Sequence, residues 1–403
     1  MRVVFLTIAG SEHILSRGGY GDLLRTFVDN GHEVYVVCAA ERRRNENTTL
    51  SVYDQMRVLS VRTGNLQKAP LPEKLVATML VEHQFVAAIN EYLHDIAFDL
   101  VLYATPPITF DRVVRHIKER DGAVSYLLLK DIFPQNAVDM GMIRGGGVAW
   151  RYFRSREKRL YANSDFIGCM SDGNVRYVLE NNPEVTREKI EVCPNNVDPV
   201  DLSYFEAAGA DVRSTYGIPA DAVLLLYGGN LGVPQGLDFL LEILDACRDR
   251  QDVYFLIVGS GTQYPKIRAH MDKASYSNAQ LMSAIPKEQY DSVLGQCDVG
   301  LVFLDPRFTI PNFPSRVNAY MEAAVPILAA TDTNTDLRDV LEEAQAGLWV
   351  ENGNLAGFIT ALDQLVEDAD LRAQMGNYGR EYLERHFTSA LAYETIVARL
   401  EAS

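Results

Sequence analysis

An arginine that follows a proline-rich loop is the first residue of this chain whose position suggests chemistry. The segment 304–316, LDPRFTIPNFPSR, overlaps the end of the apolar run VGLVFL, and its three prolines forbid a regular helix there. From Arg316 onward apolar residues recur at helical spacing, and Ser315 just before them is a typical N-cap residue. A helix that begins after a strand offers free N–H groups to an anion, and Arg316 adds a fork of donors suited to phosphate. We therefore expect a bound anion here; the alternative is an ordinary strand-to-helix connection with a surface arginine.

A second polar group follows another buried strand. Leu127–Leu129 are apolar, and Lys130 and Asp131 come directly after them. Open α/β sheets bind their ligands at the carboxyl ends of their strands. Asp131 is therefore a candidate catalytic residue that accepts a proton or a hydrogen bond from a substrate hydroxyl. The alternative is that it caps the turn before Pro134.

A glycine-rich loop follows the first apolar strand, at 3–9, and contains His13, Gly18 and Gly19. Glycine has no Cβ and lets the backbone approach a ligand closely. The loop lacks the G-x-G-x-x-G spacing directly after the strand, which argues against an NAD enzyme. We keep His13 as a candidate catalytic residue; the alternatives are a solvated histidine on a flexible surface turn.

These polar residues are separated by strands and helices that alternate along the whole chain. After Arg316 the order is helix, strand (ILAAT), helix (LRDVLEEAQAG) and strand (LWV), which predicts a parallel sheet with ligands at its carboxyl edge. The segment 222–244 repeats the strand, glycine loop and helix order of residues 3–30. With 403 residues the chain is also too long for one ordinary core. We therefore predict an α/β protein with two βα-rich halves.

Several motifs resemble the retaining glycosyltransferases of family 4, which have the GT-B fold, and most of all the branch that builds bacterial capsule and O-antigen repeat units. The resemblance is carried by FPSR, by a helix ending in Ala-Val-Pro, by ILAAT and EEAQAGLWVENGN, by KDIFPQ in place of D-x-W-P-E, and by PNNVD in place of P-N-G-V-D. It implies two Rossmann-like domains facing across a cleft. The implied division is an acceptor-binding domain at 1–198, a linker at 199–222, a nucleotide-sugar-binding domain at 223–380, and a helix at 381–403 that crosses back to the first domain.

The resemblance also assigns roles in donor binding. It places Gly18 and Gly19 against the donor diphosphate, Gly259 and Gly261 beneath the nucleotide, and the backbone near Ile285 against the nucleobase. Ser315 and Arg316 fall at the diphosphate.

The polar residues typical of the family are partly replaced. Family members commonly carry Arg and Lys where this chain has Asn230 and Gln235, which leaves the diphosphate to backbone donors and to the arginine described first. The family's paired glutamates fall on Pro311 and Ala319. Glu322, one helical turn beyond Ala319, is the remaining candidate for a ribose contact; the alternative is an ordinary surface glutamate.

The function implied by the resemblance is transfer of a sugar, with retention, from a nucleoside-diphosphate sugar to a lipid-linked glycan acceptor in bacterial envelope polysaccharide biosynthesis. We expect the donor to be a UDP-sugar. Two alternatives stay open: a UDP-sugar epimerase of the same architecture, and a non-catalytic subunit that binds nucleotide sugars. No cofactor is implied, and no metal, because no D-x-D-like pair follows a strand.

The charge of the chain argues against one partner and its local distribution suggests another. A net charge of −16 and a pI near 4.9 argue against nucleic acid. Within this acidic chain, residues 145–161 interleave aromatic and basic side chains: Trp150, Tyr152, Phe153 and Tyr161 with Arg151, Arg154, Arg156, Lys158 and Arg159. Such a helix fits an anionic membrane surface or a diphosphate-bearing lipid acceptor. The alternative is a solvated helix with its aromatic rings in the core.

We expect no signal peptide and no membrane span. The first ten residues, MRVVFLTIAG, lack the long apolar core of a secretory signal. No run approaches the roughly 18 apolar residues that a spanning helix needs. Five cysteines without a C-x-x-C pair predict buried thiols in a reducing compartment. The expected location is the cytoplasm, with peripheral attachment to the inner face of the cell membrane.

Overall fold

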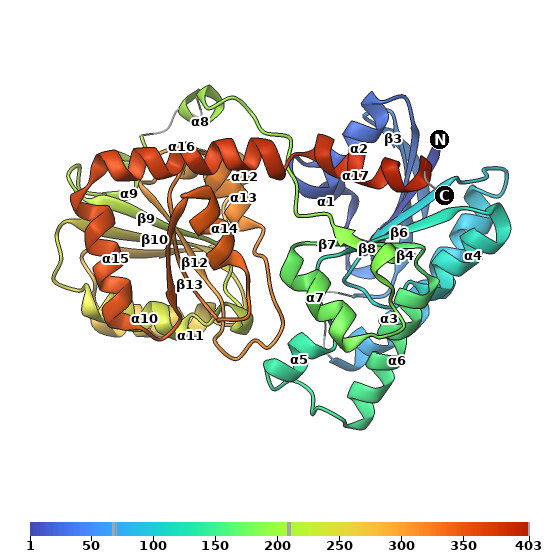
Figure 1. Ribbon diagram of the computed structural model, residues 1–403, viewed down its shortest axis with the longest axis horizontal. Helices are drawn as coiled ribbons and strands as arrows, with labels where there is room; N and C mark the ends of the chain where they lie inside the picture. Colours follow the sequence, from blue (N-terminus) through green and yellow to red (C-terminus); the bar gives the residue numbers. More distant parts are fainter. Residues whose placement is uncertain (67–68, 70, 208–210, 402–403) are drawn as a thin grey trace. The chain divides into compact units, whose positions relative to one another are not determined.

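The chain folds into two compact units, each built on a largely parallel sheet with helices on both faces (Figure 1). The computed structural model describes residues 1–66, 69, 71–207 and 211–401. Unit 1 comprises Met1–Asp198 together with Thr388–Ser403, and unit 2 comprises Pro199–Phe387. The chain therefore passes from one unit to the other twice.

Unit 1 contains an eight-stranded sheet in the order β3-β4-β2-β1-β5-β6-β7-β8. Its strands are β1 Arg2–Leu6, β2 Glu33–Glu41, β3 Thr49–Tyr53, β4 Met56–Thr63, β5 Leu100–Ala104, β6 Val124–Leu129, β7 Phe166–Cys169 and β8 Ile190–Val192. β3 pairs antiparallel with β4, and the other pairs are parallel. The central strands are buried on both faces because helices cover both. The strand order reverses between β1 and β5, which is where open α/β sheets bind ligands.

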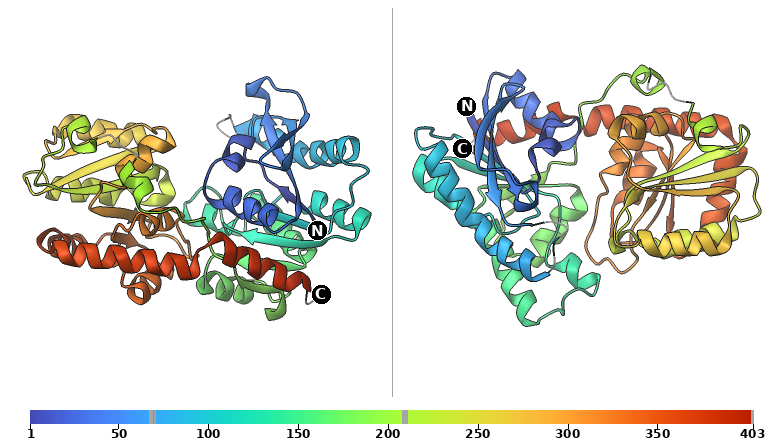
Figure 2. Two further views of the ribbon diagram at one scale, coloured as in Figure 1. Left: turned by 90° about the horizontal axis from the view of Figure 1, so that it is seen from above. Right: turned by 180° about the vertical axis from the view of Figure 1, so that it is seen from behind.

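The helices of unit 1 include the last helix of the chain. They are α1 Ser11–Leu15, α2 Gly19–Asp29, α3 Leu71–Tyr92, α4 Asp111–Asp121, α5 Gln135–Asp139, α6 Val148–Asn163, α7 Asp172–Asn181 and α17 Ser389–Glu401. α17 lies beside α2 (Figure 2). The rings of Phe27 and Tyr393 meet edge to face at 4.9 Å, and the Tyr393 hydroxyl is 2.8 Å from His32 Nε2. The C-terminal helix thus packs on the first unit, as the fold expected from the sequence requires.

The chain returns to unit 1 between two helices, whereas the sequence predicted one helix at 381–403. α16, Ala369–His386, belongs to unit 2 and ends before Phe387, which is buried. Thr388 pairs with Val197 of unit 1 in an isolated β-bridge, and its hydroxyl accepts the N–H of Leu391 at 3.2 Å. These contacts end one helix and begin the next, and they depend on tertiary partners that helical periodicity does not reveal.

Unit 2 contains a six-stranded parallel sheet in the order β11-β10-β9-β12-β13-β14. Its strands are β9 Val223–Asn230, β10 Val253–Ser260, β11 Ala279–Met282, β12 Val299–Phe303, β13 Ile327–Thr331 and β14 Gly347–Glu351. Its helices are α8 Ser203–Ala207, α9 Val212–Tyr216, α10 Asp238–Ala246, α11 Tyr264–Ala274, α12 Lys287–Leu294, α13 Arg316–Glu322, α14 Leu337–Ala344, α15 Leu355–Glu367 and α16. The strand order reverses between β9 and β12, which is the position in this sheet that favours a ligand.

Candidate functional site

The carboxyl ends of β9 and β10 in unit 2 are held close together by glycines. A Cβ on Gly259 would lie 1.9 Å from the carbonyl oxygen of Gly229, and one on Gly261 would lie 2.3 Å from that of Leu231. Gly229 itself has a φ of 124°, which a side chain would strain. Gly259 and Gly261 therefore allow the backbones of β9 and β10 to touch next to the strand reversal, and their contact with a nucleotide stays a prediction.

Arg316 lies at this reversal point, because it follows β12 in sequence and its guanidinium reaches back to β9. Its Cζ is 4.4 Å from the ring centroid of Tyr227, and its Nη2 donates to Gln235 Oε1 at 2.6 Å. The Tyr227 hydroxyl in turn donates to the carbonyl of Asn230 at 2.8 Å. The buried Nη1 of Arg316 has no hydrogen-bond partner among the described residues. A guanidinium that is fixed on two sides and keeps a buried N–H group without a partner among the described residues is well suited to bind an anion.

The other donor-binding candidates of unit 2 lie near the same edge with less defined roles. Asn230 is exposed at the end of β9, and Ile285 is half-buried in the loop after β11. Ser315 occupies the N-cap position of α13, but its side chain accepts no capping hydrogen bond there. Contact of these three residues with a nucleotide remains a prediction.

Glu322 has a structural contact. It is 4% exposed, and its Oε1 accepts the N–H of Val200 at 3.1 Å. Arg380 donates to the carbonyls of both Glu322 and Val200. Glu322 also lies six residues after Arg316, roughly 9 Å along the helix axis. These contacts favour a role in fixing the start of unit 2 over the ribose contact expected from the sequence.

Asp131 lies at the carboxyl end of β6, next to the strand reversal of unit 1. The hydroxyl of Thr105, at the end of β5, accepts the N–H of Lys130 at 3.0 Å and that of Asp131 at 3.1 Å. Asn136 Nδ2 donates to Asp131 Oδ1 at 2.6 Å. Burial raises the pKa of Asp131 to about 6, although the hydrogen bonds from Asn136 and from the Ile132 backbone oppose the shift. A carboxyl group with this pKa exchanges a proton near neutral pH, which suits an acid–base role.

Lys130 and Thr105 hold this region in place, and the sequence did not assign either of them a role. Lys130 Nζ donates to the carbonyls of Cys193 at 3.2 Å and Pro194 at 3.1 Å, beyond the end of β8. Burial lowers the pKa of Lys130. Thr105 directly follows the buried strand β5, and Lys130 directly follows the buried strand β6, one residue before Asp131. Their position at the end of a buried strand is the feature of the sequence that could have identified them. Together they connect the carboxyl ends of β5, β6 and β8.

The glycine loop of unit 1 has the backbone conformation that requires glycine. Gly18 and Gly19 have φ values of 107° and 51°, and a Cβ on either would meet no atom within 4 Å. Asp22 holds the loop, because its Oδ1 accepts the Gly18 N–H at 2.9 Å and its Oδ2 accepts the Asp198 N–H at 3.0 Å. His13 lies in α1, and its side chain is outside the described part of the structure. Contact of the loop with a diphosphate stays a prediction, as does a catalytic role for His13.

Helix α6 differs from the solvent-facing basic helix that its sequence suggested. Arg154 pairs with buried Glu157 at 2.6 Å, and Arg156 pairs with Glu82 of α3 at 2.7 Å and with Asp111 of α4 at 2.8 Å. These two arginines are structural, because each neutralises buried carboxylates. Several other side chains of this region remain exposed: Arg144, Val148, Arg151, Tyr152, Lys158 and Arg159.

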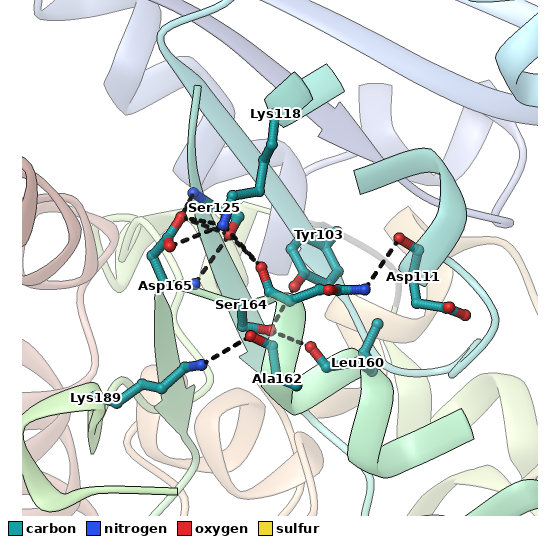
Figure 3. Close-up of polar contacts among 10 residues, drawn as sticks. Tyr103, Asp111, Lys118, Ser125, Leu160, Ala162, Ser164, Asp165 and Lys189 are labelled. Carbon is teal, nitrogen blue, oxygen red and sulfur yellow. Dashed lines mark hydrogen bonds and ion pairs between the residues drawn. The ribbon is translucent and has the colours of Figure 1, made fainter. Parts of the chain in front are cut away.

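The C-terminal end of α6 is fixed to the sheet by a polar network (Figure 3). Asp165 accepts hydrogen bonds from the backbone and hydroxyl of Ser125, both at 2.9 Å, and pairs with Lys118 at 2.7 Å. The Tyr103 hydroxyl is 2.5 Å from the hydroxyl of Ser164, which donates to the carbonyl of Leu160. The helix is thus anchored at this end.

Comparisons with known proteins bear on the family and the fold. Residues 210–382 match the family model described as glycosyl transferases group 1. The probable glycosyltransferase WbjE of Pseudomonas aeruginosa is 21% identical over 74% of each chain, and the putative colanic acid biosynthesis glycosyl transferase WcaI of Escherichia coli (strain K12) is 21% identical over 96% of each.

Solved structures show the same fold along the whole chain. The sucrose-phosphate synthase of Thermosynechococcus elongatus superposes with a TM-score of 0.77 at 16% identity, covering 100% of this chain and 99% of the other. Anabaena HepE in complex with UDP-glucose superposes with a TM-score of 0.71 at 14% identity, covering 100% of both chains. The resemblance expected from the sequence is therefore confirmed: residues 210–382 match the group 1 glycosyltransferases, and the chain has the GT-B fold of retaining glycosyltransferases that use nucleotide sugars.

Proposed function

We propose that this enzyme transfers a sugar from a UDP-sugar, with retention, to a lipid-linked glycan acceptor in bacterial envelope polysaccharide biosynthesis. The observation that carries the proposal is Arg316, whose buried Nη1 lacks a partner among the described residues at the strand reversal of the family domain. HepE has been solved with UDP-glucose, and WcaI is named for colanic acid biosynthesis. Both support the choice of donor and pathway.

In this proposal Arg316 stabilises the departing diphosphate. The negative charge on the leaving group grows as the glycosidic bond to phosphate breaks, and a fixed guanidinium stabilises that charge without having to reorganise. Gln235 and Tyr227 hold the guanidinium in place through the contacts at 2.6 Å and 4.4 Å. Gln235 thus acts through the arginine rather than as a second positive charge.

Asp131 accepts the hydrogen bond or proton of the acceptor hydroxyl in this proposal. Its pKa near 6 leaves it mostly ionised at neutral pH, as an acceptor must be. Thr105 and Asn136 fix its backbone and its side chain. In this proposal unit 1 binds the acceptor through Asp131, and unit 2 binds the donor through Arg316.

The lipid-linked acceptor requires contact with a membrane, and unit 1 has exposed apolar and basic side chains suited to it. The large apolar side chains concerned are 44–87% exposed: Val76, Met79 and Leu80 on α3, with Met142, Val148 and Tyr152 in and before α6. The ion pair between Arg156 and Glu82 joins the two helices. Arg144 and Arg151 are exposed beside the apolar residues, and their side chains have no ion-pair partner among the described residues. Apolar side chains flanked by basic ones fit an anionic bilayer surface, and no described helix is long and apolar enough to cross a bilayer.

A ligand panel tests the donor. Purified enzyme should melt at a higher temperature with UDP or a UDP-sugar than with GDP, ADP or dTDP, because only a ligand that binds the native state stabilises it. Slow hydrolysis of the UDP-sugar without acceptor would support transfer. Interconversion of the free UDP-sugar would instead identify an epimerase, and tight binding without either reaction would identify a non-catalytic subunit.

A further inference from the structure

A cavity of about 70 Å³ lies in unit 1 between α6, α7 and the segment that follows Asp131. Three stretches of chain line it: Ile132, Pro134 and Gln135; Trp150, Arg154 and Glu157; and Tyr177, Asn181 and Asn182. One water needs roughly 10–15 Å³ on such a measure, so the cavity has room for several waters or for part of a ligand. All of its walls belong to one unit.

Some of the polar groups that line the cavity lack partners. Asn182 is only 1% exposed; its Nδ2 donates to the carbonyl of Val178 at 2.9 Å, but its Oδ1 has no hydrogen-bond partner within the described chain. The Tyr177 hydroxyl and the Trp150 indole N–H likewise form no hydrogen bond to a described residue. Buried polar atoms without partners are rare in folded proteins, so the Asn182 oxygen points to a ligand. The three groups provide one acceptor, one group that both donates and accepts, and one donor.

The charges in the cavity wall cancel, which argues against an anionic ligand. Arg154 Nη1 donates to Glu157 Oε2 at 2.6 Å, and its Nη2 donates to the carbonyl of Asn181 at 2.6 Å. The other oxygen of Glu157 accepts the Tyr161 hydroxyl at 3.0 Å. The arginine is therefore already neutralised, and the cavity favours a neutral, hydrogen-bonding ligand over a phosphate.

We propose that this cavity binds a neutral sugar ring of the acceptor glycan, a proposal that rests on the proposed function. A sugar hydroxyl both donates and accepts, so a sugar can pair with Asn182 Oδ1, with the Tyr177 hydroxyl and with the indole N–H of Trp150. The apolar C–H face of a pyranose packs against aromatic rings of the kind that Trp150 and Tyr177 supply. Because Ile132 follows Asp131 directly in the chain, the bound ring belongs to the acceptor whose hydroxyl Asp131 engages.

Tryptophan fluorescence reports binding directly, because Trp150 is one of only two tryptophans and the other, Trp349, lies in β14 of unit 2. The probes are methyl glycosides of common hexoses and N-acetylhexosamines, titrated to about 50 mM so that dissociation constants in the millimolar range are detected. At least one glycoside should give a saturable change in the wild type. The Trp150→Phe variant should give none.

Two cavity variants separate sugar binding from folding. Tyr177→Phe removes one hydroxyl, and Asn182→Leu removes the unpartnered oxygen; each should weaken sugar binding about tenfold, the scale of one well-placed hydrogen bond to a buried group. Arg176→Ala is the matched control, because Arg176 is exposed on the same helix and does not line the cavity. It should bind sugar like the wild type. Tyr177→Phe should also retain the melting temperature of the wild type.

The proposal is overturned if no glycoside changes the Trp150 signal, or if a signal persists undiminished in both cavity variants, in which case the cavity holds water only. UDP binding, measured separately by thermal shift, keeps the two proposals apart. Sugar binding without UDP binding would refute the proposed donor and leave this site standing. UDP binding without sugar binding would overturn the proposed sugar site and leave the proposed donor standing.

Discussion

Replacing Arg316 with alanine should abolish most of the affinity for UDP while leaving the fold intact. The wild-type guanidinium keeps Nη1 free for a phosphate oxygen, since Nη2 is already used by Gln235. One hydrogen bond between charged groups contributes about 1.5–3 kcal/mol, which corresponds to a 10- to 150-fold rise in the dissociation constant. We expect a loss of about 100-fold for Arg316→Ala.

The stability of the unliganded protein should change little, because two effects oppose each other. The substitution removes the stacking on Tyr227, worth about 0.5–2 kcal/mol, and the hydrogen bond to Gln235. It also removes a buried donor that has no partner among the described residues, and such a donor costs about 1–3 kcal/mol. These contributions nearly cancel.

Thermal unfolding with and without UDP measures both quantities. At a UDP concentration 100 times the wild-type dissociation constant, the ligand adds about 2.7 kcal/mol to the wild type but only about 0.4 kcal/mol to a variant that binds 100-fold more weakly. The UDP-dependent rise in melting temperature should therefore nearly disappear in Arg316→Ala.

Arg213→Ala is the matched control for this experiment. Arg213 pairs with Asp298 at 2.8 Å, just before β12 and so at the opposite, amino edge of the same sheet. This variant should melt at a lower temperature than the wild type and keep the full UDP-dependent rise. A folded Arg316→Ala protein that binds UDP within about twofold of the wild type would refute the role of Arg316.

Three further predictions concern unit 1. Asp131→Asn should abolish turnover. Burial raises the pKa of Asp131 in the folded protein from its ordinary value of 3.8 to about 6, so the wild type should lose stability relative to this variant as the pH rises from about 4 to 6. Parallel pH profiles of the two melting temperatures would contradict this. Gly19→Val should destabilise the protein by about 1–2 kcal/mol more than Gly19→Asn, because asparagine tolerates the positive φ of 51°, and equal stabilities in urea titrations would be evidence against strain at this position. Replacing Arg144, Val148 and Arg151 together with serine should reduce co-sedimentation with anionic but not neutral liposomes at low salt; undiminished binding would mean that this surface does not meet the membrane.

The order of strands and helices was predictable because it follows from local patterns. Apolar strands that alternate with helices along the chain indicated two parallel sheets. The loop after VGLVFL identified the strand end that precedes Arg316. The same argument placed Asp131 at the carboxyl end of β6, where the structure has it. Position along the chain was sufficient for both, since parallel strands all end at one edge of their sheet.

Side-chain partners were not predictable, because they come from distant parts of the chain. Nothing near Arg156 in sequence shows that it neutralises Glu82, which lies 74 residues away. Glu322 accepts the N–H of Val200, 122 residues away, a structural contact that its helix position did not reveal, and its contact with a ribose stays a prediction. A charge pattern on a helix gives the face that each side chain occupies and leaves open which other helices cover that face.

The assignment of α17 to unit 1 has a consequence for the order in which a newly made chain can fold. The sheet of unit 1 is synthesised first, but Phe27 stays without the Tyr393 ring, and Glu191 without Arg399, until the last helix leaves the ribosome. Unit 2, in contrast, is one continuous segment that can complete its core earlier. A nascent chain therefore carries an uncovered apolar face on α2 while unit 2 is being made, and unit 1 is completed only after unit 2 has been synthesised.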